Sequence, residues 1–112
     1  MLVISFERNQ QNEITGFTAS GHTNYGVEGE DIVCAAASSI IQTAALGVLM
    51  VAETEAKINR DDKKGYFALK LPKDITDIQR RECNIILNTM MLGLDDLSQN
   101  YSDFIEIEGM KK

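Results

Sequence analysis

Hydrophobic and polar residues alternate in several short stretches of the chain, and this pattern predicts β-strands. Residues 2–7 and 14–20 alternate on either side of a polar turn at residues 9–12, so they are expected to form a β-hairpin. Gly16, within the second of these stretches, is expected at a bulge or a close-packed position. Residues 66–71 alternate clearly and end at Pro72, while residues 56–60 and 104–108 are shorter strand candidates.

Two longer stretches predict helices. The first is expected from residue 32 to about residue 52, with Asp31 as its N-cap and apolar residues nearly all round. The second is expected from about residue 76 to 100, where spacings of three and four define one apolar stripe of Cys83, Leu87, Met90, Leu94, Leu97 and Tyr101. The order ββαββα, with an optional last strand, predicts one α+β domain over residues 1–112. Both helices should cover one face of a largely antiparallel sheet.

Charge and composition narrow the classes of function. The net charge is -6, and no basic cluster exceeds two adjacent residues, which argues against direct nucleic-acid binding. Residues 34–52 carry no charge, but flanking acids and internal Ser, Thr and Gln favour a helix of the protein core over a membrane span. The first residues lack a signal-peptide pattern, and two cysteines make no disulfide framework. We therefore expect a cytoplasmic protein with reduced thiols.

Candidate chemistry is concentrated where the single histidine, His22, precedes Cys34 by a loop. At the third helical position, the thiol of Cys34 would meet the positive end of the helix dipole, which favours the thiolate. An imidazolium from His22, which follows Gly21 at a strand end, would lower the thiol pKa further, whereas the Asp31 carboxylate would raise it. The residues alone leave open a structural alternative, in which Cys34 is simply a small buried residue.

Other polar or small residues near this pair also have two interpretations. Ser38, one turn after Cys34 on the same helix face, could hydrogen-bond near a thiolate or bond back to a carbonyl. Gly26 and Gly29 would suit a mobile lid or an ordinary surface turn. Cys83 is expected in the core. One His and two Cys are too few for structural zinc, and no phosphate-binding glycine loop is present, so neither a metal nor a cofactor is expected.

The motif Gly21-His22, a short loop, then Asp31-Ile-Val-Cys34-Ala-Ala-Ala-Ser38 resembles that of the ribosomal-processing cysteine protease family, Prp. The resemblance extends over nearly the whole chain. It implies Cys34 as nucleophile and His22 as general base, with Asp31 and Ser38 at the remaining motif positions. The spacing marks no third catalytic residue, so we expect a dyad, in which Asn24 or Asp31 could orient His22. It also implies a homodimer and a mobile loop over the site, at residues 23–30. The implied substrate is the precursor of large-subunit ribosomal protein twenty-seven, from which an N-terminal extension is removed.

Two other functions compete with a protease. One is a non-catalytic, ribosome-associated binding module of the same fold, in which His22 and Cys34 only pack. The other is a thiol redox sensor that uses Cys34 alone, against which the core position of Cys83 argues because no resolving thiol remains. The residues by themselves favour the binding module, and the resemblance favours the protease.

Overall fold

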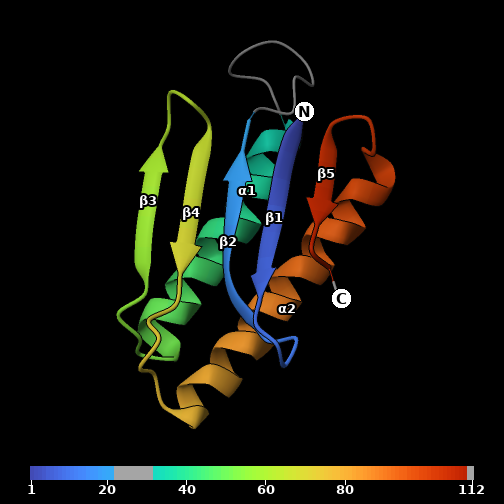
Figure 1. The fold of residues 1–112 in the computed structure, drawn as a ribbon. Coiled ribbons are helices and arrows are strands. Elements are labelled where there is room, and N and C mark those ends of the chain that lie inside the picture. The colour runs from blue at the N-terminus through green and yellow to red at the C-terminus, as the bar shows by residue number, and fades with distance from the viewer. Residues whose placement is uncertain (22–31, 111–112) are drawn as a thin grey trace.

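The computed structural model describes residues 1–21 and 32–110. Figure 1 shows a single sheet with two helices behind it. In chain order the elements are β1 (Leu2–Arg8), β2 (Ile14–Ser20), α1 (Ile32–Leu46), the π-helix η1 (Gly47–Val51), β3 (Lys57–Asp61), β4 (Tyr66–Lys70), α2 (Asp77–Asn100) and β5 (Ile105–Glu108). The expected α+β class and element order are confirmed, and the optional last strand is present.

The sheet has the strand order β3-β4-β2-β1-β5. Three of its strand pairs are antiparallel, and β5 pairs with β1 in parallel, so the sheet is mixed but largely antiparallel, as expected. The parallel pairing of β5 with β1 is possible because α2 crosses behind the sheet before the chain enters β5 (Figure 1). Residues from the two ends of the chain therefore lie side by side, with Leu2 opposite Ile105.

The β1–β2 hairpin shows how local sequence sets the register. The Asn9 side chain accepts hydrogen bonds from the backbone N–H groups of Gln11 and Glu13, which closes the predicted turn. A register shift follows, because Glu7 pairs with Gly16 whereas Arg8 pairs with Ile14. A Cβ on Gly16 would lie 2.6 Å from the carbonyl oxygen of Leu69, so this position is both beside a bulge and tightly packed against β4.

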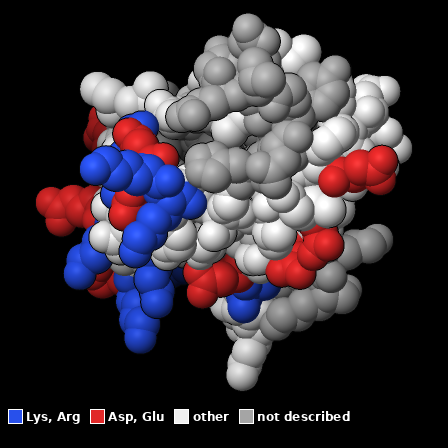
Figure 2. All heavy atoms as spheres, turned by 90° about the horizontal axis from the view of Figure 1, so that it is seen from above, with Lys and Arg blue, Asp and Glu red and all other residues white. Residues whose placement is uncertain are grey.

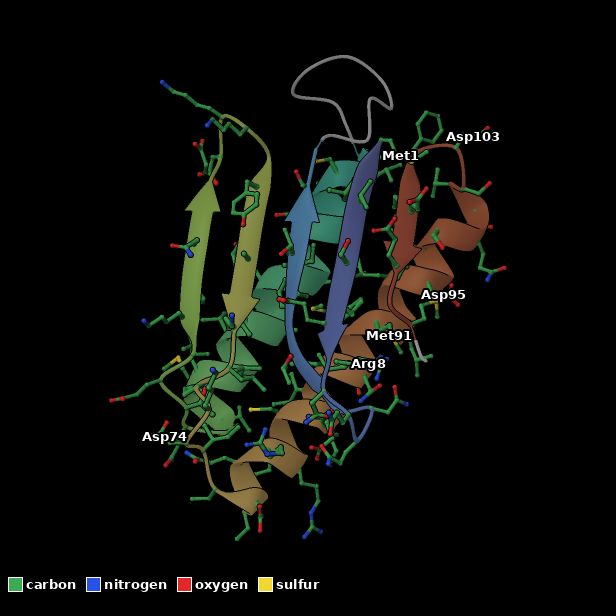
Figure 3. All side chains as sticks on the ribbon, in the orientation of Figure 1. Met1, Arg8, Asp74, Met91, Asp95 and Asp103 are labelled. Atoms are coloured by element: carbon green, nitrogen blue, oxygen red, sulfur yellow. The ribbon has the colours of Figure 1, made fainter. Side chains whose placement is uncertain are left out.

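Arg8 ties the end of β1 to the C-terminal segment. Its guanidinium donates hydrogen bonds to the carbonyl oxygens of Asn12 and Gly109, both at 2.8 Å, and to that of Met110. It also lies 3.4 Å from the sulfur of Met91 on α2 (Figure 3). One side chain thus joins the hairpin, the second helix and the residues after β5.

Helix α1 packs on the sheet along one side only. Its buried residues are Val33, Ala37, Ile41, Ala44 and Ala45. The opposite side is exposed although it is partly apolar, with Ile32 61% and Leu46 56% exposed, and the exposed apolar surface continues in η1 with Met50 and Val51. An 18-residue window within residues 32–51 has a mean hydropathy of 1.9, so this segment is apolar and long enough to cross a membrane, a property shared by many core helices of soluble proteins. The expectation that this helix is a core helix holds for its sheet-facing side and is wrong for the other.

Helix α2 begins with a capping box, which the apolar spacing along the chain did not indicate. The Thr76 hydroxyl accepts from the Gln79 backbone N–H, and the Gln79 side chain accepts from that of Thr76. The predicted apolar stripe faces the sheet, and Cys83, Leu87 and Leu94 are completely buried. Asn84 fixes the register of the helix on the sheet, because its amide bonds both the N–H and the carbonyl oxygen of Ile14 in β2.

Candidate active site

A cavity of about 160 Å³ opens at the first turns of α1. Its wall is formed by residues from β1, β2, α1, β3, β4 and the turns between them: Leu2, Ala19, Gly21, Cys34, Ser38, Ile41, Gln42, Arg60, Asp62, Gly65, Tyr66 and Phe67. Most of this wall is apolar, and its polar groups come from α1 and from the β3–β4 hairpin. A mostly apolar cavity with a few polar groups and a thiol is a candidate binding site beside a nucleophile.

Cys34 is the third residue of α1 and is half-buried on the cavity wall. The first turn of a helix leaves backbone N–H groups without helical partners, and the helix dipole adds partial positive charge there. Both effects stabilise a thiolate, or an oxyanion formed next to it. The thiol is not in a disulfide. Its predicted place at the third position of this helix is confirmed, and the cavity beside it was not predicted.

Ser38 and Gln42 follow Cys34 at intervals of one turn on the same face of α1. All three residues line the cavity. The Gln42 amide nitrogen donates a hydrogen bond of 2.8 Å to the Ser38 hydroxyl oxygen. The structure thus brings Ser38 into the same cavity as Cys34 and adds Gln42, whose part in the site was not predicted from the sequence. A spacing of four residues was the signal that could have found it.

Gly21 has a structural reason to be glycine. Its φ is +100°, and a Cβ there would lie 2.5 Å from the Met1 carbonyl oxygen. Its N–H donates to the Gly65 carbonyl oxygen at 3.0 Å, which ties the end of β2 to the β3–β4 turn. The chain therefore leaves β2, immediately before His22, from a fixed position at the cavity wall. His22, Asn24, Gly26, Gly29 and Asp31 themselves lie outside the described residues, as does the loop at residues 23–30.

The β3–β4 hairpin supplies one side of the cavity that sequence reasoning did not foresee. Arg60 and Asp62 form an exposed ion pair at 3.1 Å, and the Arg60 guanidinium lies 5.8 Å from the centre of the Phe67 ring. Figure 2 shows Lys and Arg side chains gathered at one side of the molecule, with acidic side chains among them. Strand pairing brings Arg60, Asp62 and Phe67 to the cavity from far along the chain, so no local sequence signal marked them.

Cys83 occupies the opposite kind of environment. It lies on the core stripe of α2 with no exposed surface, as predicted. Burial raises the pKa of the Cys83 thiol above its usual value, and the neighbouring Glu82 carboxylate raises it further, against a smaller opposing effect of Arg80. At neutral pH this thiol is protonated and enclosed, and it is therefore a poor nucleophile.

No group of three or more His, Cys, Asp or Glu side chains in residues 1–21 and 32–110 is placed to hold a metal ion. Among the residues that the structure describes, the cavity wall has one thiol, one hydroxyl, one amide, one guanidinium, one phenol and one carboxylate. Of these groups, the thiol at the helix start is the strongest nucleophile near neutral pH. The arrangement therefore defines a candidate thiol-dependent site for acyl transfer.

Comparisons with known proteins agree with this class. The sequence model of the family described as cysteine protease Prp matches residues 1–106. The ribosomal processing cysteine protease Prp of Bacillus subtilis is 23% identical over 107 residues, which is 96% of each chain. The essential ribosomal processing protease Prp of S. aureus has been solved with a covalently linked product peptide. That structure is 27% identical to this chain with a TM-score of 0.86, and the match covers 96% of this chain and 98% of that one. A second structure, with a substrate peptide, is 26% identical with a TM-score of 0.81 over the same shares of the two chains.

The fold and the cavity thus define an α+β protein of the cysteine protease class, with a thiol at a helix start. The chain belongs to the cysteine protease Prp family. The resemblance inferred from the motif at residues 21–38 is confirmed by this match, which extends over almost the entire sequence. The redox-sensor alternative loses support, because Cys83 is enclosed in the core and does not line the cavity.

Proposed function

We propose that this protein is a cysteine endopeptidase that removes the N-terminal extension of large-subunit ribosomal protein twenty-seven and so supports ribosome assembly. The observation that carries the proposal is the half-buried thiol of Cys34 at the start of α1, on the wall of a mostly apolar cavity. The S. aureus relatives, bound to a substrate peptide and to a product peptide, support a peptide-cleaving activity for this fold.

The proposed mechanism uses a Cys34–His22 dyad. The Cys34 thiolate attacks the scissile carbonyl carbon, and backbone N–H groups at the first turn of α1 stabilise the resulting oxyanion. The His22 imidazolium then protonates the leaving amine, and the thioester forms. Water, deprotonated by His22, attacks this thioester, which releases the carboxylate product and the free thiol. The start of α1 supports the first part of this proposal, because it places the thiol beside the helix N–H groups.

Cleavage of the precursor tests the proposal directly. We expect wild-type protein to remove one N-terminal segment from the precursor encoded in the same genome, seen as a single mass loss that persists in chelator. Cys34→Ala should reduce the rate by about a thousandfold or more, because the nucleophile is absent. Cys34→Ser should be nearly inactive, since a hydroxyl is far less acidic than a thiol. Cys83→Ala is the matched control and should cut at close to the wild-type rate.

The alternative is a non-catalytic, ribosome-associated binding module of the same fold. It would be supported if wild-type protein bound the precursor and left it uncut, with Cys34→Ala binding equally well. Cleavage by Cys34→Ala would contradict the assignment of the nucleophile. These outcomes separate the two functions, because wild-type protein and Cys34→Ala both retain the cavity and differ only in the thiol.

The dyad has a separate test in the pH dependence of thiol alkylation. If the His22 imidazolium stabilises the thiolate, His22→Ala should move the alkylation profile of Cys34 to higher pH. Asn24→Ala and Asp31→Asn, compared in the same assay, report which residue orients the imidazole. An unchanged profile for His22→Ala, both in the free protein and with bound peptide, would contradict the dyad.

A cytoplasmic homodimer completes the proposal. The exposed apolar side of the helices supports it. A groove of about 590 Å³ between α1, η1 and α2 is lined mainly by apolar side chains, and Ile85 and Val51 at its edge are 61% and 74% exposed. Burial of such a surface favours association. Sedimentation equilibrium should give a dimer at micromolar concentration, and Ile85→Lys should shift the population to monomer. A wild-type monomer under these conditions would contradict the homodimer.

A further inference from the structure

The Ser38 hydroxyl is a hydrogen-bond acceptor toward Gln42. Its oxygen accepts the hydrogen bond from the Gln42 amide nitrogen at 2.8 Å. A hydroxyl has one proton and two lone pairs, so the Gln42 amide uses one of the acceptor positions. The Ser38 proton must therefore point away from Gln42. Both residues line the cavity, so the direction of this proton decides whether Ser38 can donate a hydrogen bond to a group bound there.

Other hydroxyls in the helices of this protein use their protons differently. The Thr89 hydroxyl donates to the Ile85 carbonyl oxygen and the Ser98 hydroxyl to that of Asp95, both at 2.7 Å. Such bonds to the previous turn are the usual arrangement for helical Ser and Thr. In the described part of the chain, the Ser38 hydroxyl has the Gln42 bond and no bond to a carbonyl of the previous turn. Its proton is therefore not committed to the backbone of the helix, unlike those of Thr89 and Ser98.

The spacing along α1 places the Ser38 hydroxyl one turn from Cys34 on the same cavity wall. Cys34, Ser38 and Gln42 are each one turn apart, so their side chains form one row on the cavity wall. Side chains in a helix lean toward its N-terminus, so Gln42 leans over Ser38, and Ser38 leans toward the turn of Cys34. Gln42 is two turns, about 12 Å, from Cys34 and acts only through Ser38.

We propose that Gln42 is a positioning residue for the proteolytic reaction. The Gln42 amide donates to one lone pair of the Ser38 oxygen. The Ser38 proton is thereby kept free to donate a hydrogen bond into the cavity. There, negative charge is carried by the Cys34 sulfur when it reacts as a thiolate and develops on the carbonyl oxygen under attack. Donors that are already oriented toward such charge need no reorganisation during the reaction. This inference rests on the proposed protease chemistry at Cys34 and assigns Gln42 a part in it.

Replacement of Gln42 by glutamate tests the direction of the Ser38–Gln42 hydrogen bond, because the two side chains have almost the same shape. A carboxylate only accepts hydrogen bonds, so the Ser38 proton would turn to the introduced carboxylate and leave the cavity. All proteins carry Cys83→Ala, so that alkylation by iodoacetamide reports Cys34 alone. We expect Gln42→Glu and Ser38→Ala each to lower the alkylation rate about tenfold, the effect of losing one hydrogen bond to a charged group. Gln42→Met, which has neither donor nor charge, should cause a smaller loss.

A double-mutant cycle separates the hydrogen bond from the added charge. In the Ser38→Ala background the carboxylate of Gln42→Glu still repels a thiolate, but it has no hydroxyl to turn. The loss caused by Gln42→Glu should therefore be several-fold smaller in that background than in the presence of Ser38. Equal losses in the two backgrounds would overturn the proposal, as would wild-type rates in both Gln42 variants. Circular dichroism checks that each variant is folded.

The pH dependence supplies a readout that a purely structural role would not change. Once protonated, the carboxyl group introduced by Gln42→Glu again donates to the Ser38 oxygen. The ratio of variant to wild-type alkylation rates should therefore recover as pH falls toward about 4.3, the usual pKa of a glutamate side chain. The ratio for Gln42→Met should stay constant with pH, and a constant ratio for Gln42→Glu would contradict the proposal. Alkylation requires no precursor, so a protein that shows this pattern but cuts no precursor would refute the proposed function and leave the positioning role supported.

Discussion

The two cysteines of this protein are chemically identical and lie in opposite environments. Cys34 is in the first turn of α1, half-buried and on the wall of a cavity. Cys83 is in the second turn of α2, completely enclosed between that helix and the sheet. The first has helix N–H groups and solvent access, whereas burial raises the pKa of the second.

This difference shows that position decides whether a thiol can be a nucleophile. A thiolate at Cys34 is stabilised by the partial positive charge of a helix start. A thiolate at Cys83 would lose its hydration with nothing to replace it, so the neutral thiol packs there as a small apolar side chain. The same residue type therefore serves reactivity in one place and the core in the other.

The largest expected difference is in alkylation rate. In the native protein, iodoacetamide should modify Cys34 at least about a hundred times faster than Cys83, because Cys83 reacts only when α2 opens locally. Timed labelling followed by mass mapping of the peptides measures both rates in one sample. Equal rates, or faster labelling of Cys83, would break the comparison. In denaturant the two rates should converge, which is the internal control.

Substitution by serine should also distinguish the two positions, by a smaller amount. Here Cys83 is the more sensitive of the two, because its replacement should lower the free energy of unfolding more than replacement of Cys34. Cys83→Ser buries a hydroxyl in the apolar core and should lower the free energy of unfolding by about 1–3 kcal/mol. Cys34→Ser, half-buried at a helix start, should change it by less than about 0.5 kcal/mol. Urea denaturation followed by circular dichroism measures both. A larger loss for Cys34→Ser than for Cys83→Ser would contradict the assignment of Cys83 to the core.

The smallest expected effect is the contribution of Cys83 to the pH dependence of stability. Its pKa is raised in the folded state, so the unfolded chain releases this proton first as pH rises past about 8.5, the usual pKa of a thiol. Unfolding is then favoured, and stability falls with a slope of at most about 1.4 kcal/mol per pH unit from this group. Below that pH the contribution is fully retained. Denaturation between pH 7 and 10 should show a shallower decline in Cys83→Ala than in wild type. Parallel curves would mean that the Cys83 thiol has the same pKa in both states.

Both cysteine environments were predictable because each depends on local pattern. The spacing of apolar residues placed Cys83 on the core stripe of α2, and the start of the apolar run at residue 32 placed Cys34 in the first turn of α1. The motif at residues 21–38 also indicated the family, which the comparison confirmed. The apolar side of α1 was wrongly expected to be buried, because hydrophobicity alone does not tell a buried face from an exposed one.

The sequence by itself determined the strands, the two helices, the family and the position of the candidate nucleophile, because periodicity and helix ends are set by neighbouring residues. Only the tertiary structure decided the strand order, the parallel pairing of β5 with β1 and the cavity wall contributed by Arg60, Tyr66 and Phe67. It also decided the direction of the hydrogen bond between Ser38 and Gln42. These features arise from contacts between segments far apart in the chain and from the orientation of single side chains. The strand order and the cavity wall form when the sheet and helices pack together, and the pattern along the chain does not encode them. The spacing of Ser38 and Gln42 is local, but the direction of their hydrogen bond is set by how the two side chains are oriented.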